Sequence, residues 1–138
     1  MAYETHWEPE GVRWAYTGVM TDDDILRSNL EIYSDPRFES IRYQIADLRG
    51  VDRFDGSARA VRRLSRMDRD QATRNPGIRV AILADDALVR GIANVYAMSG
   101  AESPWETRVF KSEEEARRWL NAVLPRDAED AGEKEADS

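Results

Sequence analysis

The run Ile78–Ala84 (IRVAILA) constrains the fold of this chain more than any other stretch, because Arg79 is its only polar residue. A strand that is buried on both faces has this pattern, and such strands are typical of parallel sheets covered by helices. Amphipathic helical patterns precede and follow the run, over residues 58–74 and 86–100. The run therefore predicts a central strand of an α/β sheet.

Strand and helix patterns alternate along the rest of the chain. Two short strands joined by the turn Pro9–Gly11 predict an opening antiparallel hairpin. The strand–helix–strand repeats that follow predict right-handed crossovers and parallel pairing. We therefore predict an α/β fold with a mixed, mostly parallel five-stranded sheet and four helices. The predicted strands are 3–8, 12–18, 41–48, 78–84 and 105–110, and the predicted helices are 21–35, 58–74, 86–100 and 112–124.

Capping residues define the ends of two helices. Thr21 with Asp24 and Ser112 with Glu115 have capping-box spacing, so each pair predicts a helix start. Pro125 predicts the end of the last helix, because proline cannot donate the backbone hydrogen bond that continues it. Residues 1–124 are expected to form one domain. Residues 125–138 lack large apolar side chains and are expected to be a disordered acidic tail.

Charge and composition limit the class of protein. The tail holds six acidic and two basic residues, which gives −4 of the net charge of −7, and a near-neutral acidic body argues against nucleic-acid binding. There is no cysteine, so no disulfide and no thiolate zinc site is expected. The N-terminal stretch lacks signal-peptide features, and no apolar run reaches the roughly 20 residues of a membrane span. A cytoplasmic protein without a transmembrane segment is expected.

Two predicted loops follow the third and fourth strands. Ligands of open parallel sheets gather at the carboxyl ends of the strands, so these loops are the candidate partner-binding region. Their candidate residues are Asp52, Asp55, Gly56 and Ser57 in the first loop, and Asp85 and Asp86 in the second.

Ser57 has two interpretations. As a structural residue it caps the helix that follows, because its hydroxyl can accept a hydrogen bond from a free backbone N–H. As a switch it is a candidate phosphorylation site, since a phosphate is favoured at the positive end of a helix. Arg59 and Arg62 are the candidate anion-facing residues nearby, although an arginine-rich stripe is also typical of a solvated helix face.

Enzyme signatures are weak. The single histidine, His6, lies in the first predicted strand, far in sequence from the candidate loops. Neither a G-x-S-x-G nucleophile elbow nor a phosphate-binding G-x-x-x-x-G-K-[ST] loop occurs, and no cofactor is predicted. Carboxylates could hold magnesium, but capping, turn and solvated roles explain them as well, and no metal site is predicted. The carboxylates concerned are Asp47, Asp52, Asp55, Asp85 and Asp86.

The stretch Asp47–Ala60 (DLRGVDRFDGSARA) resembles the strand–loop–helix segment of STAS domains, the family of anti-sigma factor antagonists and sulfate-transporter tails. The resemblance implies that a partner kinase phosphorylates the serine of this loop, which is Ser57 here, with Asp55 in the acidic place of the loop. Gly56 stands where the family usually has a first serine, and Ala58 stands where glycine is usual.

The chain from Tyr3 to Leu124 also resembles a set of small, uncharacterised bacterial proteins similar to STAS or to lipid-binding Sec-fourteen-type domains. The matching segments include "ADLRGV", "RVAILADDALVRGIANVYA" and "VFKSEEEARRWL". The lipid-binding likeness implies an apolar pocket between sheet and helices. The aromatic residues proposed to line it are Trp14, Tyr16, Tyr96 and Trp105, although residues at such spacings are also typical of an ordinary core.

These observations favour a non-enzymatic, STAS-like regulatory module that binds a protein partner under phosphorylation control. A binder or sensor of a small lipophilic ligand is the alternative, and an enzyme of unknown reaction is the third. The sequence permits a homodimer without requiring one.

Overall fold

The computed structural model describes residues 3–99 and 103–129. Its strands and helices follow one another in the predicted order, with one additional 3-10 turn, η1. In chain order the elements are β1 (Tyr3–Glu8), β2 (Gly11–Thr21), α1 (Asp22–Tyr33), η1 (Pro36–Glu39), β3 (Tyr43–Asp55), α2 (Ala58–Gln71), β4 (Arg79–Leu83), α3 (Ala87–Ser99), β5 (Glu106–Phe110) and α4 (Glu113–Glu129).

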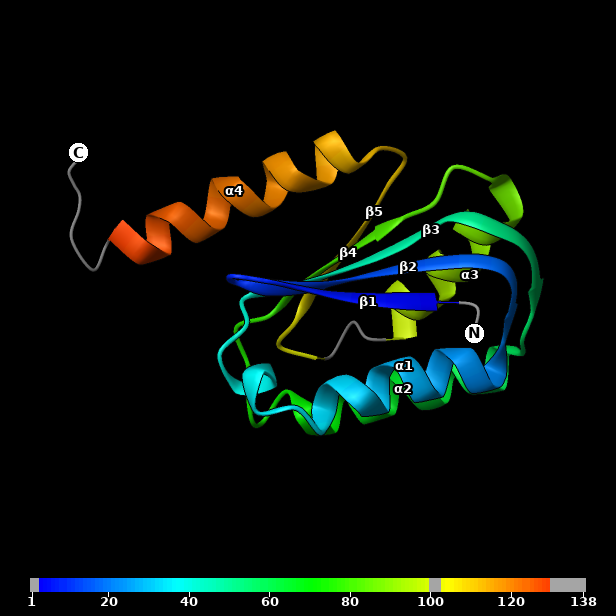
Figure 1. The fold of residues 1–138 in the computed structure, drawn as a ribbon, viewed down its shortest axis with the longest axis horizontal. Coiled ribbons are helices and arrows are strands. Elements are labelled where there is room, and N and C mark those ends of the chain that lie inside the picture. Colours follow the sequence, from blue (N-terminus) through cyan, green and yellow to red (C-terminus); the bar gives the residue numbers. More distant parts are fainter. Residues whose placement is uncertain (1–2, 100–102, 130–138) are drawn as a thin grey trace.

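The five strands form one sheet in the order β1-β2-β3-β4-β5. β1 pairs with β2 antiparallel, and the other three pairings are parallel. Each parallel strand lies beside the next one in the chain, so the connecting helices α1, α2 and α3 all fall on the same face of the sheet (Figure 1). Helix α4 lies on the opposite face. The predicted fold class is confirmed.

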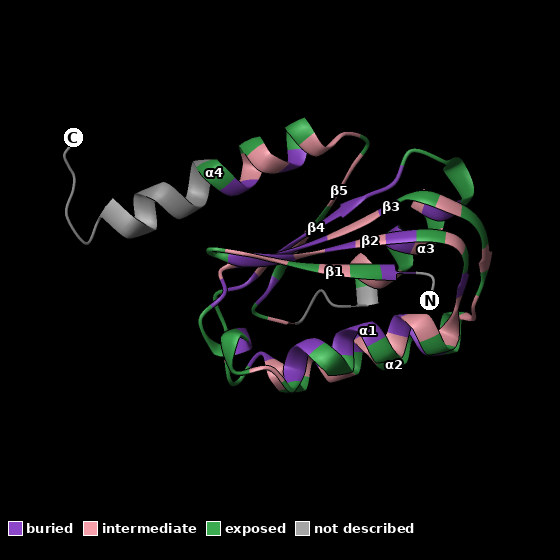
Figure 2. Ribbon diagram, viewed as in Figure 1, coloured by how far each residue is buried: buried purple, intermediate pink, exposed green. Residues whose placement is uncertain are grey.

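The main apolar core lies between the sheet and helices α1–α3, as the buried segments in Figure 2 show. Turn η1 closes one end of this core with Phe38, which is fully buried. The Phe38 ring packs edge-on against Tyr33 and Trp105, at centroid distances of 5.2 and 6.2 Å. Burying side chains of this size provides most of the driving force for folding.

Helix α4 is held to the other face by a small apolar group and a charged network. The apolar group consists of Tyr43, Ile45, Ala81, Leu83, Ala116 and Leu120. In the network, Arg117 of α4 donates to both carboxylate oxygens of Glu8 at 2.7 and 2.8 Å. Arg13 of β2 donates to Glu113 of α4 at 2.9 Å and to Asp47 at 2.6 Å. These partly buried pairs connect α4 to β1 and β2, and Arg13 connects β2 to β3.

Strand β3 is longer than the predicted strand 41–48. It continues to Asp55 and pairs with β2 as far as Thr21, whereas its pairing with β4 covers only Tyr43–Asp47. The far half of β3 therefore belongs to a two-stranded ribbon that exposes most of its side chains, so its polar sequence resembles a loop. The predicted loop position of Asp52 and Asp55 is wrong, because both lie on this strand.

Two helices leave large apolar side chains exposed. Leu30 of α1 and Leu88 of α3 are 52% and 67% exposed. In α1 the buried positions include the polar residues Ser28 and Asn29, whose side chains donate to the backbone oxygen of Ile25 at 3.2 and 2.9 Å. These internal hydrogen bonds let polar residues occupy a buried face.

Helix α4 does not end at Pro125 as predicted but continues to Glu129. Proline removes one backbone hydrogen bond from a helix, yet its fixed φ is compatible with helical geometry, so a helix end at proline is a preference only. Residues 130–138 of the predicted acidic tail lie outside the described residues, and the disorder of the tail stays a prediction.

Candidate functional site

Ser57 is the N-cap of helix α2. Its backbone is extended, and its hydroxyl oxygen accepts a hydrogen bond from the backbone N–H of Ala60 at 3.1 Å. This bond satisfies one of the backbone donors that have no partner inside the helix. The capping interpretation of Ser57 is therefore confirmed, and its phosphorylation stays a prediction.

Asp22, the first residue of α1, forms two hydrogen bonds with Ser57. The backbone N–H of Ser57 donates to Asp22 Oδ1 at 2.7 Å, and the Ser57 hydroxyl donates to Asp22 Oδ2 at 2.9 Å. The parallel pairing of β2 with β3 ends at Thr21 and Asp55, so the two chains leave the sheet side by side. Sequence reasoning missed Asp22, because Thr21 and Asp24 already explained this helix start.

Gly56 allows this close approach. A Cβ atom at this position would lie 2.7 Å from Cζ of Phe54 and 2.8 Å from Oδ1 of Asp22, which is closer than nonbonded atoms can pack. A side chain at position 56 would therefore force the Phe54 ring and the Asp22 carboxylate to move.

The carboxylates of the two candidate regions are exposed. Asp55 forms a 3.6 Å ion pair with Arg53 on the surface of β3. Asp85 and Asp86 follow β4, and Asp86 caps α3 by accepting from the backbone N–H of Leu88 at 2.9 Å. Asp47 of β3 pairs with the last residue of β4, and β3 continues for eight residues beyond Asp47. The region after β3 and the region after β4 therefore leave the sheet at different positions along the strand direction.

Asp47 does not join the other candidate carboxylates. It lies in the charged network against α4, where Arg49 donates to it with two bonds of 2.9 Å. The hydrogen bonds from Arg49 and the nearby charge of Arg13 lower the Asp47 pKa in spite of its burial, which would raise it. Within residues 3–99 and 103–129, no three Asp, Glu or His side chains come together as metal ligands.

Arg59 and Arg62 lie on the exposed face of the first turns of α2. The structure pairs neither of them with a carboxylate of the described residues. Most arginines elsewhere in the described chain are ion-paired, for example Arg13, Arg37 and Arg117. Both arginines are therefore available to an anion near the N-terminus of α2.

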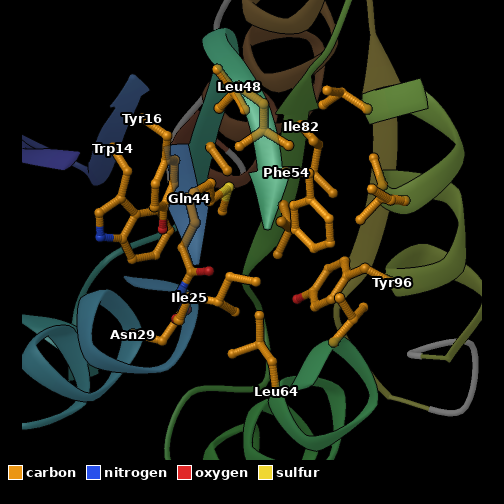
Figure 3. A pocket seen from close by; sticks show the side chains of 18 residues that line it. Trp14, Tyr16, Ile25, Asn29, Gln44, Leu48, Phe54, Leu64, Ile82 and Tyr96 are labelled. Atoms are coloured by element: carbon orange, nitrogen blue, oxygen red, sulfur yellow. The ribbon is translucent and has the colours of Figure 1, made fainter. Parts of the chain in front are cut away.

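An apolar pocket lies between the sheet and helices α1–α3, with a volume of about 80 Å³. Its wall combines apolar side chains of β2, β3 and β4 with those of the three helices (Figure 3). None of its 18 lining residues is charged. Three of the four aromatic residues proposed to line a pocket do so: Trp14, Tyr16 and Tyr96.

Trp105 does not line this pocket, so that part of the prediction is wrong. Its ring packs against Phe38 at the far end of the core, and its indole N–H donates to the backbone oxygen of Asn75 at 2.7 Å. The turn after α2 and the start of β5 therefore fix its position.

Hydrogen-bonded polar pairs lie beside the pocket. The Tyr16 hydroxyl and the Ser28 hydroxyl are hydrogen-bonded at 2.6 Å, and the Tyr96 hydroxyl donates to the carboxyl group of Asp68. Asp68 of α2 is 3% exposed, and burial raises its pKa to about 8. The side chain of Asp68 is therefore mostly protonated and neutral near pH 7.

His6 is exposed on β1, and its Nε2 atom lies 3.3 Å from a carboxylate oxygen of Glu4. It lies on the edge strand of the sheet, away from both Ser57 and the apolar pocket. The residues around Ser57 and the pocket-lining residues therefore include no histidine.

The fold of this chain is similar to that of several solved structures. No family model and no curated protein matches the chain. Among solved structures, the unphosphorylated anti-sigma factor antagonist SpoIIAA matches with a TM-score of 0.57 and 18% identity over 88% of this chain and 100% of that one. The Bacillus cell fate determinant SpoIIAA in its phosphorylated form matches with a TM-score of 0.55 and 19% identity over 86% and 99%. An uncharacterised DUF3478-family protein from Shewanella loihica PV-4, with a SpoIIAA-like fold, matches with a TM-score of 0.56 and 17% identity over 86% and 92%.

The chain therefore has a SpoIIAA-like fold. At these levels of identity, the likeness establishes the fold alone. Across the described part of the chain, no helix is both long enough and apolar enough to span a membrane.

Proposed function

We propose that this chain is a cytoplasmic, non-enzymatic regulatory module that binds a protein partner around the start of α2, and that phosphorylation of Ser57 controls the binding. The observation that carries the proposal is the setting of Ser57. Its hydroxyl is partly exposed at the N-terminus of a helix and bonded to Asp22, with two unpaired arginines in the following turns. The likeness in fold to a protein solved in phosphorylated form supports it.

The electrostatics of this site favour a change on phosphorylation. A phosphate on Ser57 would carry close to two negative charges at the positive end of α2, within reach of side chains such as Arg59. The same phosphate would stand against the carboxylate of Asp22, which now accepts the hydrogen from the Ser57 hydroxyl. Phosphorylation would therefore replace the Ser57–Asp22 contact and alter the surface that a partner meets.

The test compares four full-length chains as bait in lysate of the source cells: the native chain, Ser57→Asp, Ser57→Asn and Ser40→Asp. Asparagine has the shape of aspartate and also caps helices, so only the charge separates the two Ser57 variants. Ser40 is exposed in the turn after η1, and its variant controls for added charge elsewhere.

We expect the native chain, Ser57→Asn and Ser40→Asp to capture the same partner in similar amounts. We expect Ser57→Asp to capture much less of it. Intact-mass spectrometry of the chain isolated from its own cells should show added phosphate that Ser57→Ala lacks. Equal retention by all four baits would contradict the switch, and phosphate that persists in Ser57→Ala would contradict the site.

We propose as a second candidate function the binding of a small lipophilic ligand, and the apolar pocket favours it. A cavity lined by apolar side chains with a few polar groups is the usual form of a small-molecule site. Native mass spectrometry of freshly purified full chain tests this function. A retained mass that organic extraction removes is expected, and the bare chain mass alone would count against it.

A further inference from the structure

Gln44 is a polar residue in the middle of an apolar sheet face. It lies on β3, paired in register with Val12 of β2 and Val80 of β4, and it is 1% exposed. Its neighbours along the same face of β3 are Ala46 and Leu48, which also line the pocket. Figure 3 shows the Gln44 side chain reaching from the strand into the pocket, toward Ile25 and Asn29.

The amide nitrogen of Gln44 is buried and has no hydrogen-bond acceptor among the described residues. A buried donor without a partner is strongly disfavoured, and most such groups in folded proteins are paired with protein, water or a ligand. The nearby Asn29 amide differs, because it donates to the backbone oxygen of Ile25 at 2.9 Å. Trp14 also lines the pocket, and its indole N–H is buried without a partner among the described residues, but Figure 3 shows that nitrogen on the side of the ring away from the pocket. Gln44 is therefore the pocket-lining donor that an acceptor from outside the chain would satisfy.

The charges around the pocket restrict that acceptor. No lining residue is cationic, so a carboxylate or phosphate would lose its hydration without a compensating charge. The acid behind Tyr96, Asp68, is itself held mostly neutral by burial. A neutral acceptor such as a carbonyl or ether oxygen pays no comparable penalty.

The volume restricts the size of the group that enters. A hydrocarbon-lined cavity of roughly 150 Å³ admits benzene, so about 80 Å³ accommodates a group of only a few non-hydrogen atoms. The walls away from Gln44 are apolar and include Leu48, Phe54 and Ile82. Such walls suit the hydrocarbon part of the bound group.

We infer that the pocket takes a neutral, apolar molecule with one acceptor oxygen, such as a ketone, ester or ether, and that this oxygen accepts its hydrogen bond from Gln44. The inference rests on the proposed ligand-binding function and adds the chemical class of the ligand. Gln44 would then determine which apolar molecules the site prefers.

Three probes of nearly equal shape test the inference: butanone, 2-methyl-1-butene and propanoate. They present a carbonyl oxygen, a methylene group and a carboxylate at the same place. Each is titrated into the full chain while NMR follows the side-chain amide of Gln44 and the methyl groups of the pocket. The variants are Gln44→Leu, which keeps the approximate shape without the donor, and Gln71→Leu at the end of α2, outside the pocket, as the matched control.

We expect butanone to bind the native chain and Gln71→Leu about two- to tenfold more tightly than the alkene, which is the value of one hydrogen bond. Butanone should shift the Gln44 amide resonances, and Gln44→Leu should bind both neutral probes equally. Propanoate should bind most weakly.

Equal binding of butanone and the alkene to the native chain would overturn the role of Gln44 and leave the ligand site standing. Tighter binding of propanoate would overturn the neutral class. Absence of binding by every probe at saturating concentration would instead overturn the ligand-binding function itself. If Gln44→Leu does not fold, the ratio of the two neutral probes on the native chain and the Gln44 amide shifts decide the question.

Discussion

Asp22 and Ser57, which are 35 positions apart in sequence, are joined by two hydrogen bonds of 2.7 and 2.9 Å. The pair connects the first residue of α1 to the N-cap of α2. It therefore fixes the relative position of two helix starts that cover the same face of the sheet.

Replacing Asp22 by alanine would leave the backbone N–H and the hydroxyl of Ser57 without their acceptor. We expect the free energy of unfolding to fall by about 1–3 kcal/mol, the usual effect of losing hydrogen bonds to a charged group. Asp23→Ala is the matched control, because Asp23 is exposed and forms only the surface pair with Arg27 at 2.9 Å. Urea unfolding followed by circular dichroism measures both, and equal losses would contradict a special role for Asp22.

Gly56→Ser introduces the residue that the STAS family usually has at this place. Its Cβ would come within 2.8 Å of both Phe54 and Asp22, so these two side chains must move, and a shift of the Asp22 carboxylate loosens its pair with Ser57. We expect a loss of stability of about 1–3 kcal/mol, which is typical of overpacking. Gly77→Ser is the control, since no atom lies within 4 Å of a Cβ there. Thermal melts that rank the two variants alike would refute this account of the loop.

Asp68→Asn should change how stability depends on pH. The folded pKa of Asp68 is raised by burial to about 8 from an ordinary value of 3.8, so the folded chain keeps a proton that the unfolded chain releases between these values. In this window each unit of rising pH lowers the folding equilibrium constant by up to about tenfold. Asparagine has no such proton and can still accept from Tyr96.

Urea unfolding between pH 5 and pH 8 tests the Asp68 prediction. The native chain should lose stability as the pH rises, relative to Asp68→Asn, and the gap should widen toward pH 8. Parallel curves for the two chains would show that the Asp68 carboxyl is not held in its protonated form.

Glu113→Gln should weaken the attachment of α4. Hydrogen bonds from Arg13 and then Arg117 lower the Glu113 pKa below its ordinary value of 4.5. Its contribution to stability is therefore full above pH 4.5 and is lost as the pH falls through the lower, folded value. Because the group is partly exposed, we expect only about 1 kcal/mol at pH 7.

The control for Glu113 is Glu114→Gln, one position along the helix. Glu114 is exposed, and its 3.2 Å pair with Arg118 lies within α4 itself. Unfolding at pH 7 and pH 3 should show a loss for Glu113→Gln at pH 7 that shrinks at pH 3, and little change for Glu114→Gln. A constant difference at both pH values would show that charge is not the cause.

The order of the elements followed from local patterns, because each strand and helix carries its own apolar period and cap. The largely apolar run of β4 and the Thr21–Asp24 cap of α1 are examples. The far half of β3 could not be recognised, since a ribbon exposed to water has the polar composition of a loop. Its apolar residues Val51 and Phe54, which pack on the core, were the available signal.

The site was predicted only in part. Ser57 was found because a capping serine has a local signature, and Trp14, Tyr16 and Tyr96 were found by their aromatic character. Asp22 was missed, because its partner depends on how far β2 and β3 pair, which no local pattern records. Gln44 was missed for a related reason, because its burial depends on apolar neighbours in two other strands, which its own sequence segment does not reveal.

The charged network under α4 makes the two layers of this domain respond differently to their solvent. Dissolved salt screens the ion pairs of Arg13 and Arg117 and so loosens α4, whereas sulfate strengthens the apolar contacts that hold α1–α3. Raising the ionic strength therefore weakens the attachment of α4, which is held by its apolar group as well, more than the attachment of α1–α3.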